Sequence, residues 1–576
     1  MKEFIKKNPD PVNDLSLALG SLRNTSEHAG AVILTPTIDD NGNPMEIFDW
    51  FPVKKVDGHL VSEYTGSELD KLGFLKNDFL GLSQLCKVKD MFKMIKDTYG
   101  KEITFENIPL DDKKVYWMFS EGYTQDIFQF NSSGMTGFLM DLQPDNIEHL
   151  ISANALYRPG AMSSDFDKEY VELRHGRKIP EFIEGTEEAL KDTYGLMIYQ
   201  ENTISLAVHY AGFSMSEGDS LRAIIGKKKV DEMPKMKNKF LDGARNLGRN
   251  LEDANKIWEQ IERTAEYQFN RSHSAAYAQL GYTTMYLKAH YPLVFYTVAL
   301  QHAKDDDKPK IIAEMNRLGE VKVSQPDINE SGQRFKPNFD KKRIYWSLVS
   351  VKWVGEKAVE KIIGERKSKG KFFSVKDLFD RVDKRTVNKR AITNLILAGA
   401  FDEIYDIKQE SDRIKILKEY YNEIIEEELP EEFKNQEEIW KNHWWILKSL
   451  ELTGLGYINY DEIIQSSSFS GESNLLVNLI RFNQDESIGQ ECILAGVIDR
   501  VIERKSKRGV FVQININHNS SEELFYTMWN ETYVKYKKNL KNSEGSIILA
   551  KGIIKHDHWK KCNVVHSNDD SRIEII

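Results

Sequence analysis

The feature that most constrains the fold of this chain is a helical pattern that runs from about Pro109 to His302. Apolar residues recur there at three- and four-residue spacing, for example from Ala254 to Ile261. Because this spacing gathers them on one face of a helix, it predicts a large, mainly helical domain. The whole chain has 576 residues, several times a typical domain length of roughly 150 residues. We therefore expect further domains on both sides.

The amino-terminal region has a different pattern. Short β-type runs, from Ala31 to Thr35 and from Ile47 to Pro52, alternate with Gly, Pro and Asn. Runs of this kind, bounded by turn residues, predict strands in an α+β domain.

Beyond the helical region the pattern changes again. A β-type segment from Arg343 to Val349 precedes helices joined by a Gly-bearing turn, and residues 402–465 have the composition of a charged helix. Residues 488–576 contain alternating apolar and polar runs, which predict the strands of a small β-barrel. The clearest runs are Glu491 to Val497, Val510 to Ile516 and Ser546 to Ile554.

The charges are strongly segregated. The formal net charge is −10, which by itself argues against nucleic-acid binding. However, Leu221 to Arg245 carries eight Lys/Arg against three Asp/Glu, whereas Phe401 to Trp440 carries five against fourteen. A local basic face can bind phosphate within an acidic chain.

The cysteines and the apolar runs exclude some classes of protein. Cys86, Cys492 and Cys562 are scattered and show no metal-ligand spacing, so neither a disulfide framework nor structural zinc is indicated. The N-terminus has no signal-peptide pattern, and the longest apolar run, Tyr291 to Leu300, is about half the length of a membrane span. We expect no membrane partner and a cytoplasmic location.

Two short motifs have candidate chemistry in their side chains. Asp78 ends an extended run, Lys76 to Leu82, between bulky apolar residues. This aspartate could ligate a metal ion, or it could be an ordinary turn or N-cap residue. Arg158 lies in Ala155 to Gly160, where Pro and Gly predict a rigid turn. The arginine suits phosphate binding or base stacking, and a structural turn that exposes an arginine is the alternative.

Two further motifs carry positive charge near helix ends. Leu221 to Lys229 ends in a triple lysine, Lys227, Lys228 and Lys229, which suits either a polyanion or a solvated loop. Residues Phe269 to Tyr277 open a helix, with Asn and Ser as good N-caps. Its free backbone N–H groups, Arg271 and His273 could face a triphosphate, although His273 could instead pack against its own helix.

Together these motifs resemble the bacterial DNA polymerase III α subunit, of the kind in which an OB-fold follows the polymerase core. The resemblance is strong from about residue 20 to residue 300, moderate through Val354-Gly355 and weak beyond. It rests on Arg23-Asn24, His28 to Gly30, Lys76 to Leu82, Pro109 to Asp112, Ile127 to Gln129, Ala155 to Gly160, Tyr194 to Glu201, Gly226 to Lys229, Phe269 to Ala278 and Leu287 to Pro292.

The resemblance implies a multidomain α+β chain. We expect the end of the thumb and the C-terminal part of the palm at residues 1–105, and the fingers at 106–305. A helix-hairpin-helix duplex-binding region is expected at 306–405. An acidic helical linker at 406–485 and an OB-fold β-barrel at 486–576 complete the expected order.

The resemblance also implies roles for individual residues. Asp78 corresponds to a palm metal ligand, for two Mg²⁺ ions. The expected contacts to nucleotide or primer-template DNA are Lys76, Arg158, Arg222, Lys227, Lys228, Lys229, Asn270, Arg271, Ser272 and His273. The expected duplex-binding hairpin contains Trp353, Gly355 and Lys357.

One aspartate cannot hold two metal ions, and the family supplies its other two carboxylates from an upstream Asp-x-Asp motif. Residues 1–77 contain no such motif. Asp165-Phe166-Asp167 has the right letters, but it follows the Arg158 turn, and we expect it at the surface. Our hypothesis is a split polymerase, from a phage or an interrupted gene, whose N-terminal half is a separate polypeptide.

Some positions depart from the family pattern. Ala223 replaces a common second arginine, Ser133 also departs, and Trp353 replaces the first glycine of a Gly-x-Gly hairpin. Trp353 could still stack on a partner, but a closer approach of the backbone to phosphate would suffer.

Two weaker signals concern partners. Gln436, Ile439 and Trp440 fit a sliding-clamp-binding peptide, although a charged helix face would give the same letters. Lys505, Lys507 and Arg508, with Phe511 nearby, fit either single-strand binding or a solvated hairpin.

The sequence thus predicts part of a DNA-directed DNA polymerase that uses primer-template DNA and dNTPs, in a bacterial or phage-infected cell. A non-catalytic DNA-binding remnant of such a polymerase is the alternative.

Overall fold

The computed structural model divides the chain into two compact units, Met1–Cys86 and Lys87–Ile576. It describes residues 30–56, 58–78, 81–158, 162, 165–226, 232–264, 267–305, 307–408, 410–434, 448–449, 452–453, 463–464, 467–472, 475–476, 482, 487–506, 509–517, 523–541, 543–544, 546–557, 562–568 and 570–575.

The first unit contains two small antiparallel sheets. Strand β1 (Ala31–Leu34) pairs with β4 (Leu75–Asp78), and β2 (Val53–Val56) pairs with β3 (His59–Ser62). The short helices are α3 (Ile47–Trp50) and α4 (Gly66–Lys71). The expectation of a strand over Ala31 to Thr35 is confirmed. The expected strand from Ile47 to Pro52 is wrong.

The local reason for helix α3 is its first turn. The Asp49 carboxylate accepts a hydrogen bond from the Glu46 backbone N–H at 2.8 Å, which satisfies a donor at the helix start. The extended segment begins only at Val53, after Pro52.

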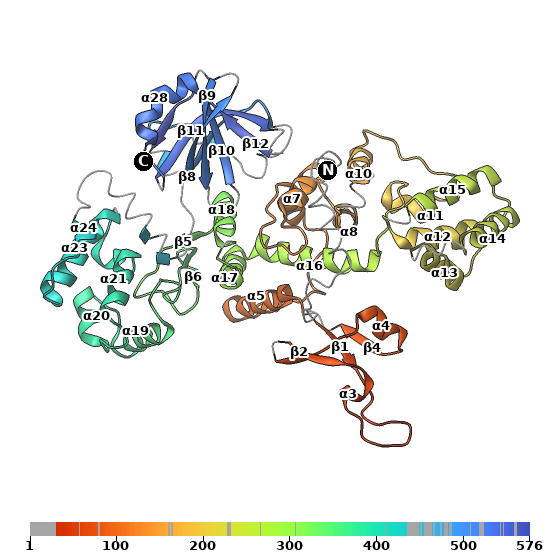
Figure 1. Cartoon of the computed structure of the whole chain (residues 1–576), viewed down its shortest axis with the longest axis horizontal. Helices are drawn as coiled ribbons and strands as arrows, with labels where there is room; N and C mark the ends of the chain where they lie inside the picture. The colour runs from red at the N-terminus through yellow and green to blue at the C-terminus, as the bar shows by residue number, and fades with distance from the viewer. Residues whose placement is uncertain are drawn as a thin grey trace, which may run out of the picture. The chain divides into compact units, whose positions relative to one another are not determined.

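The predicted helical region is confirmed from Pro109 to His302. Helices α6 to α17 lie within this region, α5 precedes it and α18 follows it (Figure 1). They are α5 (Ser83–Tyr99), α6 (Lys113–Ser120), α7 (Ser133–Leu142), α8 (Ile147–Leu156), α10 (Phe166–Arg174), α11 (Glu187–Leu190), α12 (Gln200–Ala211), α13 (Met215–Gly226), α14 (Met233–Asn246), α15 (Leu251–Thr264), α16 (Arg271–His290), α17 (Pro292–His302) and α18 (Lys308–Leu318).

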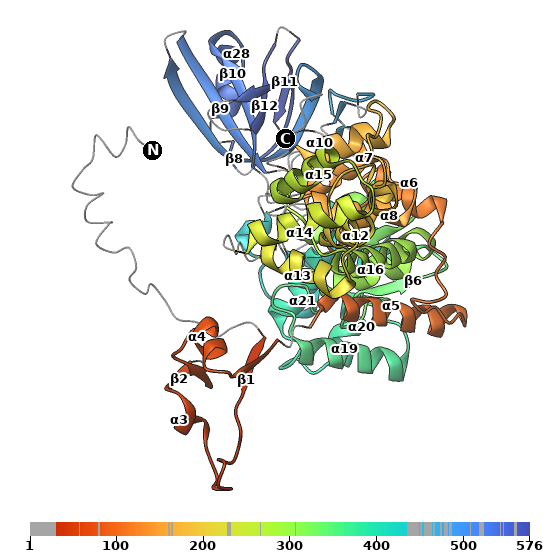
Figure 2. The same cartoon turned by 90° about the vertical axis from the view of Figure 1, so that its right-hand side faces the viewer.

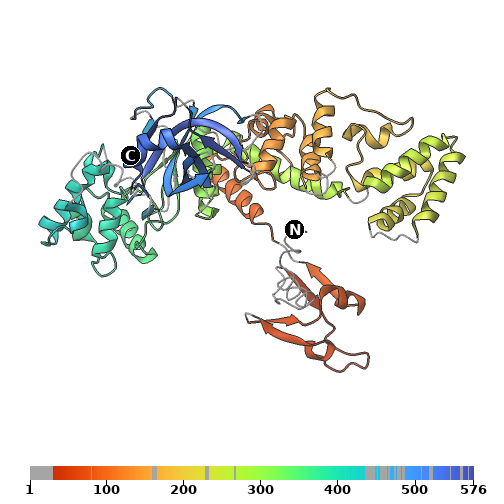
Figure 3. The same cartoon turned by 45° about the horizontal axis from the view of Figure 1, so that its top comes forward.

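Helices α11 to α15 form a cluster with its own core, shown in yellow to olive in Figure 1 and from another direction in Figure 3. The ring of Phe240 on α14 packs 5.6 Å from that of Trp258 on α15, and both side chains are fully buried. The apolar spacing that predicted α15 therefore faces this core.

Helix α16 organises the rest of the helical domain because it contacts α6, α8 and α17. Its Gly281 allows a close approach, since a Cβ atom there would lie 2.5 Å from Phe130. This contact brings the segment before α7 against the middle of α16.

After α18, a three-stranded sheet leads into a second helical region. The sheet order is β5 (Lys322–Ser324), β7 (Arg343–Tyr345) and β6 (Lys336–Asn338), which bears out a short β segment at Arg343. The helices that follow are α19 (Glu356–Lys369), α20 (Val375–Arg381), α21 (Lys389–Leu397), α22 (Asp402–Tyr405), α23 (Arg413–Lys418) and α24 (Glu431–Lys434).

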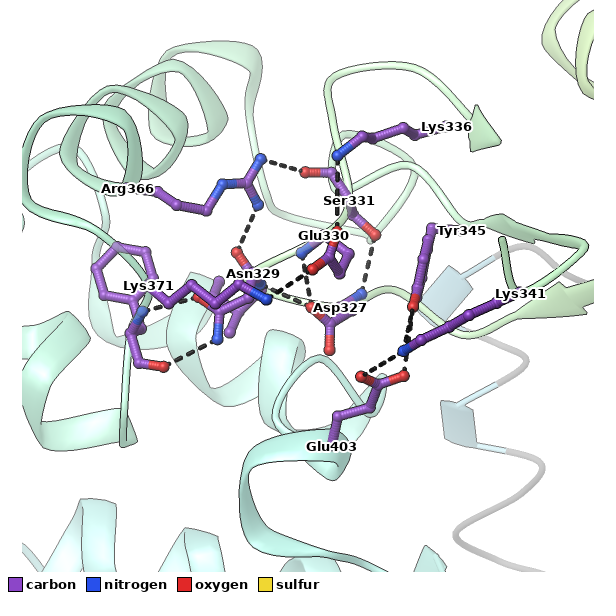
Figure 4. Close-up of polar contacts among 12 residues, drawn as sticks. Asp327, Asn329, Glu330, Ser331, Lys336, Lys341, Tyr345, Arg366, Lys371 and Glu403 are labelled. Carbon is purple, nitrogen blue, oxygen red and sulfur yellow. Dashed lines mark hydrogen bonds and ion pairs between the residues drawn. The ribbon is translucent and has the colours of Figure 1, made fainter. Parts of the chain in front are cut away.

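A polar network ties the turn after β5 to helix α19 (Figure 4). Arg366 of α19 donates to the carbonyls of Ile328 and Ser331, at 2.7 and 2.8 Å. Asn329 exchanges two 2.8 Å hydrogen bonds with the Phe372 backbone. Burial raises the pKa of the Asp327 carboxyl in the same turn. These bonds fix the start of the second helical region.

The charged helical composition expected at 402–465 takes the form of several short helical segments in the described part. Between Asp402 and Lys434 the chain forms short segments, including the 3-10 turn Glu410–Asp412 and the π-helix Glu419–Ile424. Asp406 ends α22 in a left-handed conformation, and Pro430 cannot continue a helix from the preceding segment.

The C-terminal strands close into a barrel (Figure 2). The sheet order is β12-β10-β9-β8-β11-β13, and β12 also pairs with β11, which closes a five-stranded ring. Apolar side chains of alternate β9 and β10 positions, from Val512 to Met528, fill its core. The strands are β8 (Glu491–Ser506), β9 (Gly509–Asn517), β10 (Glu523–Trp529), β11 (Ile547–Asp557), β12 (Cys562–His566) and β13 (Ile573–Ile575), with helix α28 (Asn530–Leu540) after β10.

This architecture confirms the fold expected for residues 486–576.

No helix in the described part of the chain is long and apolar enough to cross a membrane.

Candidate functional site

A cavity of about 410 Å³ lies where three separate segments of the helical domain meet. One segment precedes and begins α7, the second ends α8, and the third begins α16. The lining residues are Gln129, Ser132, Met135, Asn154, Tyr157, Arg158, Phe269, His273 and Tyr277. The structure thus brings Arg158 and His273, both predicted from the sequence, into one cavity.

Arg158 is held rigidly in the cavity wall. Its Nε donates to the Ala155 carbonyl at 2.8 Å and its Nη2 to the Tyr267 carbonyl at 2.7 Å, while the guanidinium lies 4.0 Å from the centre of the Phe269 ring. Burial lowers the pKa of this arginine. A guanidinium has five N–H donors, so these two hydrogen bonds leave donors that can reach a ligand.

The predicted helix start within Phe269 to Tyr277 is confirmed, and it lies at the cavity. Asn270 is its N-cap, and its side-chain oxygen accepts a hydrogen bond from the His273 backbone N–H at 2.8 Å. The His273 ring is exposed and stacks on Tyr277 with ring centres 4.2 Å apart. The packing of His273 on its own helix is thus observed, while its contact with a triphosphate stays a prediction.

Arg271 and Ser272 do not line this cavity. Arg271 Nη2 donates to both oxygens of Glu148, at 2.8 Å each, and its backbone N–H donates to Glu201 at 3.0 Å. The charge of Arg271 is thus matched within the protein, and Ser272 is exposed.

Arg222 lies on α13 and is also absent from the cavity lining. Its Nε donates to Asp219 at 2.8 Å and its Nη1 to Gln200 at 3.4 Å. Lys227, Lys228 and Lys229 lie outside the described residues, so their position relative to Arg222 stays a prediction.

The cavity wall before α7 is braced by a buried ion pair. Lys288 of α16, fully buried, donates to Glu314 at 2.6 Å and to the carbonyls of Tyr123 and Gln125 at 2.8 and 2.6 Å. Burial lowers the pKa of this lysine. Lys288 belongs to Leu287 to Pro292, a segment that only supported the family resemblance in the sequence. Its hydrogen bonds hold the backbone of Tyr123 and Gln125, shortly before Gln129.

Asp78 and Lys76 lie in the first unit, on strand β4. Lys76 pairs in register with Ile33 and Asp78 with Ala31, so the extended context expected for Asp78 is confirmed. The side chain of Asp78 is outside the described residues. In the described part of the chain, no group of three or more His, Cys, Asp or Glu residues is arranged to hold a metal ion.

The segment Asp165-Phe166-Asp167, which has the letters of an Asp-x-Asp motif, lies at the start of helix α10. Asp165 is exposed and pairs with Lys168 at 3.0 Å, whereas Asp167 is buried. The expected surface position therefore holds for Asp165 alone.

A second cavity, of about 600 Å³, lies in the region after β7. It contains Trp353, whose exposed ring stacks on Arg390 with the guanidinium 3.5 Å from the ring centre. Gly355 caps helix α19, and Lys357 is exposed in its first turn. The lining residues are Trp353, Asn388, Lys389, Arg390, Thr393, Asn394, Leu397, Tyr421, Phe433, Lys448 and Leu452.

Sequence reasoning missed several residues of these cavities. Lys389 and Arg390 follow Asn388, which caps α21, and a cap followed by two cations was a usable signal. Gln129 belongs to Ile127 to Gln129, a segment that supported the family resemblance but was given no role. No sequence pattern marked Asn154 as a site residue.

Some predicted residues cannot be placed. Gln436, Ile439 and Trp440 lie outside the described residues, as do Lys507 and Arg508 and the side chain of Lys505. In the barrel, Phe511 packs against Trp529 with ring centres 5.3 Å apart.

Comparison with protein families identifies two of these regions. Residues 84–248 match the family described as "Bacterial DNA polymerase III alpha subunit finger domain". Residues 320–411 match the family described as "Helix-hairpin-helix motif". The first match covers α7, α8 and Arg158, and the second covers Trp353 and Arg390.

Curated relatives point the same way. DNA polymerase III subunit alpha of Aquifex aeolicus is 38% identical over 385 residues, which are 66% of this chain and 32% of the relative. The subunit of Thermus aquaticus is 36% identical over 396 residues, 67% of this chain and 31% of the relative. The subunit of Escherichia coli K12 is 36% identical over 400 residues, 67% of this chain and 34% of the relative.

The fold and the matches define a multidomain chain with a helical finger domain, a helix-hairpin-helix region and a C-terminal β-barrel. The chain is a partial match to the bacterial DNA polymerase III alpha subunit, through its finger and helix-hairpin-helix domains. It spans about a third of the length of the curated relatives it matches.

Proposed function

We propose that this chain is part of a replicative DNA-directed DNA polymerase, which adds deoxynucleotides to a primer 3′ end. The observation that carries the proposal is that three segments of the helical domain meet at one cavity, two of them inside the finger-domain match. Gln129, Arg158 and His273 come from these segments and line the same space. His273 lies more than a hundred residues after Gln129 and Arg158 in the chain, yet the fold places all three around one space.

The chemistry of the cavity suits a deoxynucleoside triphosphate. Arg158 supplies a fixed positive charge, and the N-terminus of α16, where His273 lines the cavity, has a partial positive charge. The backbone N–H groups of Arg271 and His273 are already paired with Glu201 and Asn270, so the proposal does not use them. In our proposal Arg158 and this helix terminus bind and orient the phosphates, so that the reacting atoms are held in position. Asn270 contributes by capping the helix.

We further propose that Asp78 holds Mg²⁺ together with carboxylates from a separate N-terminal polymerase half. Two such ions would activate the primer hydroxyl and stabilise the leaving pyrophosphate. Asp78 alone does not fit two ions, which is why the proposal requires the Asp-x-Asp motif of a partner chain. Residues 1–105 would then be the end of the thumb and part of the palm.

Other regions would handle DNA. We propose that Trp353, Gly355 and Lys357, with Lys389 and Arg390 beside them, contact the phosphates of duplex DNA, since cations and a helix cap gather there. A clamp-binding role for Gln436, Ile439 and Trp440 and a single-strand role for the barrel remain parts of the same proposal.

The test is primer extension with Mg²⁺ and all four dNTPs. This chain is assayed alone and together with the N-terminal half. The Asp78→Ala variant of this chain is then assayed together with the same half. Asp70→Ala, which removes an exposed carboxylate of α4 in the same unit, is the matched control.

We expect extension only in the mixtures that keep Asp78, including the Asp70→Ala mixture. Retained primer-template binding with no extension in any mixture would instead identify a non-catalytic DNA-binding remnant.

A further inference from the structure

The first cavity is lined by an amide group with one unpaired donor atom. Asn154 of α8 lines the cavity, and its Nδ2 is shielded from solvent with no acceptor among the described residues. A buried donor left without a partner costs free energy in a protein interior. Because Asn154 lines the cavity, an acceptor bound within hydrogen-bond distance of Nδ2 would relieve this cost.

A second amide faces the same space. Gln129 lines the cavity and is exposed, on a backbone with φ of 67°. A left-handed residue other than glycine is uncommon and persists when its surroundings fix it. Here Phe128 stacks on Tyr277 with ring centres 5.3 Å apart, and Phe130 packs against Gly281. The neighbouring residues thus hold Gln129 in this position.

The remaining walls are aromatic and fixed. Tyr157 stacks on Phe138 with ring centres 5.9 Å apart, and its hydroxyl occupies the space that a side chain at Gly134 would need. His273 stacks on Tyr277 at 4.2 Å and meets Phe269 edge-on at 5.3 Å. Flat aromatic walls with two amides suit a planar ring that carries hydrogen-bond donors and acceptors on its edge.

We propose that this cavity binds one nucleobase and that Asn154 and Gln129 hydrogen-bond to its edge. An amide offers both a donor and an acceptor, the pair of groups that reads a base edge. Aromatic side chains hold unpaired bases by stacking. The cavity volume of about 410 Å³ lies in the range of small-molecule sites, roughly 300–1,000 Å³. This inference rests on the proposed function, and the base belongs either to an incoming nucleotide or to an unpaired template position.

Two probe pairs distinguish the sources of the base. The first compares dATP with inorganic triphosphate, which has no base, as competitors of a fluorescent dATP analogue. The second compares primer-template DNA with the same DNA carrying an abasic site at the first unpaired template position. Both are binding measurements on the full chain and need no polymerisation.

The variants are Asn154→Leu and Gln129→Leu, and the control is Gln260→Leu on the exposed face of α15. We expect Asn154→Leu and Gln129→Leu each to weaken the binding of the base-bearing probe by about tenfold, the scale of one lost hydrogen bond. The base-free partner of that probe should bind as before, and Gln260→Leu should change neither. Since Asn154→Leu removes the unused donor, its thermal stability should equal or exceed that of the unchanged chain.

If Asn154→Leu weakens the base-bearing and base-free probes equally, or weakens neither, the nucleobase assignment is wrong while the polymerase proposal stands. If the unchanged chain binds neither primer-template DNA nor dATP, both the proposed function and the nucleobase assignment are wrong.

Discussion

Trp353 has a backbone conformation that suits glycine. Its φ is 70°, in the left-handed region, where an L-residue is disfavoured by about 1–2 kcal/mol. This is the position at which the family resemblance places a glycine. The contact with Arg390 offsets part of the strain, because a cation over an exposed aromatic ring contributes about 0.5–1 kcal/mol.

We predict that Trp353→Gly and Trp353→Ala differ in stability. Both variants lose the contact with Arg390, but only glycine relieves the left-handed strain. The glycine variant should therefore be more stable than the alanine variant by about 1 kcal/mol. Urea denaturation measures the difference, and equal stability of the two variants would show that φ at this position is not left-handed.

His149 gives the helical domain a pH dependence. Burial and the nearby Arg174 lower the pKa of its imidazole from 6.5 to about 4. The ring is held by Tyr194, whose hydroxyl lies 2.8 Å from Nε2, and by Asp145, 3.1 Å from Nδ1. Above pH 6.5 the ring is neutral in both the folded and the unfolded chain. Between pH 6.5 and 4 the unfolded chain takes up a proton that the folded chain does not.

The folded state should therefore lose roughly 3 kcal/mol as the pH falls from 6.5 to 4, at about 1.4 kcal/mol per pKa unit. His149→Gln keeps a polar side chain but cannot titrate, so its stability should fall less over the same interval. Thermal denaturation at several pH values compares the two, and parallel curves would rule out the buried neutral imidazole.

At the scale of elements, α16 connects the cavity to the interior of the domain. Its N-terminal turn carries His273, its middle packs on Phe130 at Gly281, and its C-terminal turn carries Lys288. One rigid helix therefore positions the cavity wall at several points.

We predict opposite effects for two Gly→Ala changes in helices. Alanine gains up to about 1 kcal/mol over glycine in a helix interior. Gly364 of α19 has open space around it, so Gly364→Ala should stabilise the protein. At Gly281 the new methyl group would meet the buried Phe130 ring, and overpacking should destabilise by about 1–3 kcal/mol. Equal stabilisation of both variants in urea denaturation would contradict the close packing at Gly281.

The cap of α16 makes a further prediction. Asn270→Ala should destabilise the helical domain by about 1 kcal/mol, because the His273 N–H loses its acceptor. Asn270→Ser retains an acceptor oxygen and should lose less. Urea denaturation ranks the variants. An alanine variant as stable as the serine variant would show that this cap does not stabilise the domain.

At the scale of the whole molecule, the sequence predicted most elements that have a long repeating pattern. The helices between Pro109 and His302 and the strands of the barrel follow from periodicity over many residues. Segment Ile47–Trp50 was mispredicted because four residues give no period, and its state depends on the local contact between Glu46 and Asp49.

The candidate site was only partly predictable for a different reason. Arg158 and His273 stand out through turn and cap signals that lie next to them in the chain. Asn154 and Gln129 become visible only when α8, α16 and the segment before α7 meet in space. Arg271 carried the same charge signal as Arg158, yet the fold pairs it with Glu148, a residue far away in the sequence.

The central claim, that this chain handles the primer-template of a DNA polymerase, is tested most directly by its DNA affinity without any partner. Fluorescence anisotropy should compare a primer-template, a blunt duplex of the same length and a single strand over a range of salt concentrations. We predict that the primer-template binds most tightly, because it would engage the proposed duplex-binding and single-strand-binding regions together. Its affinity should fall steeply with salt as phosphate contacts are lost. Equal affinity for all three DNAs, or no binding at low salt, would contradict the account.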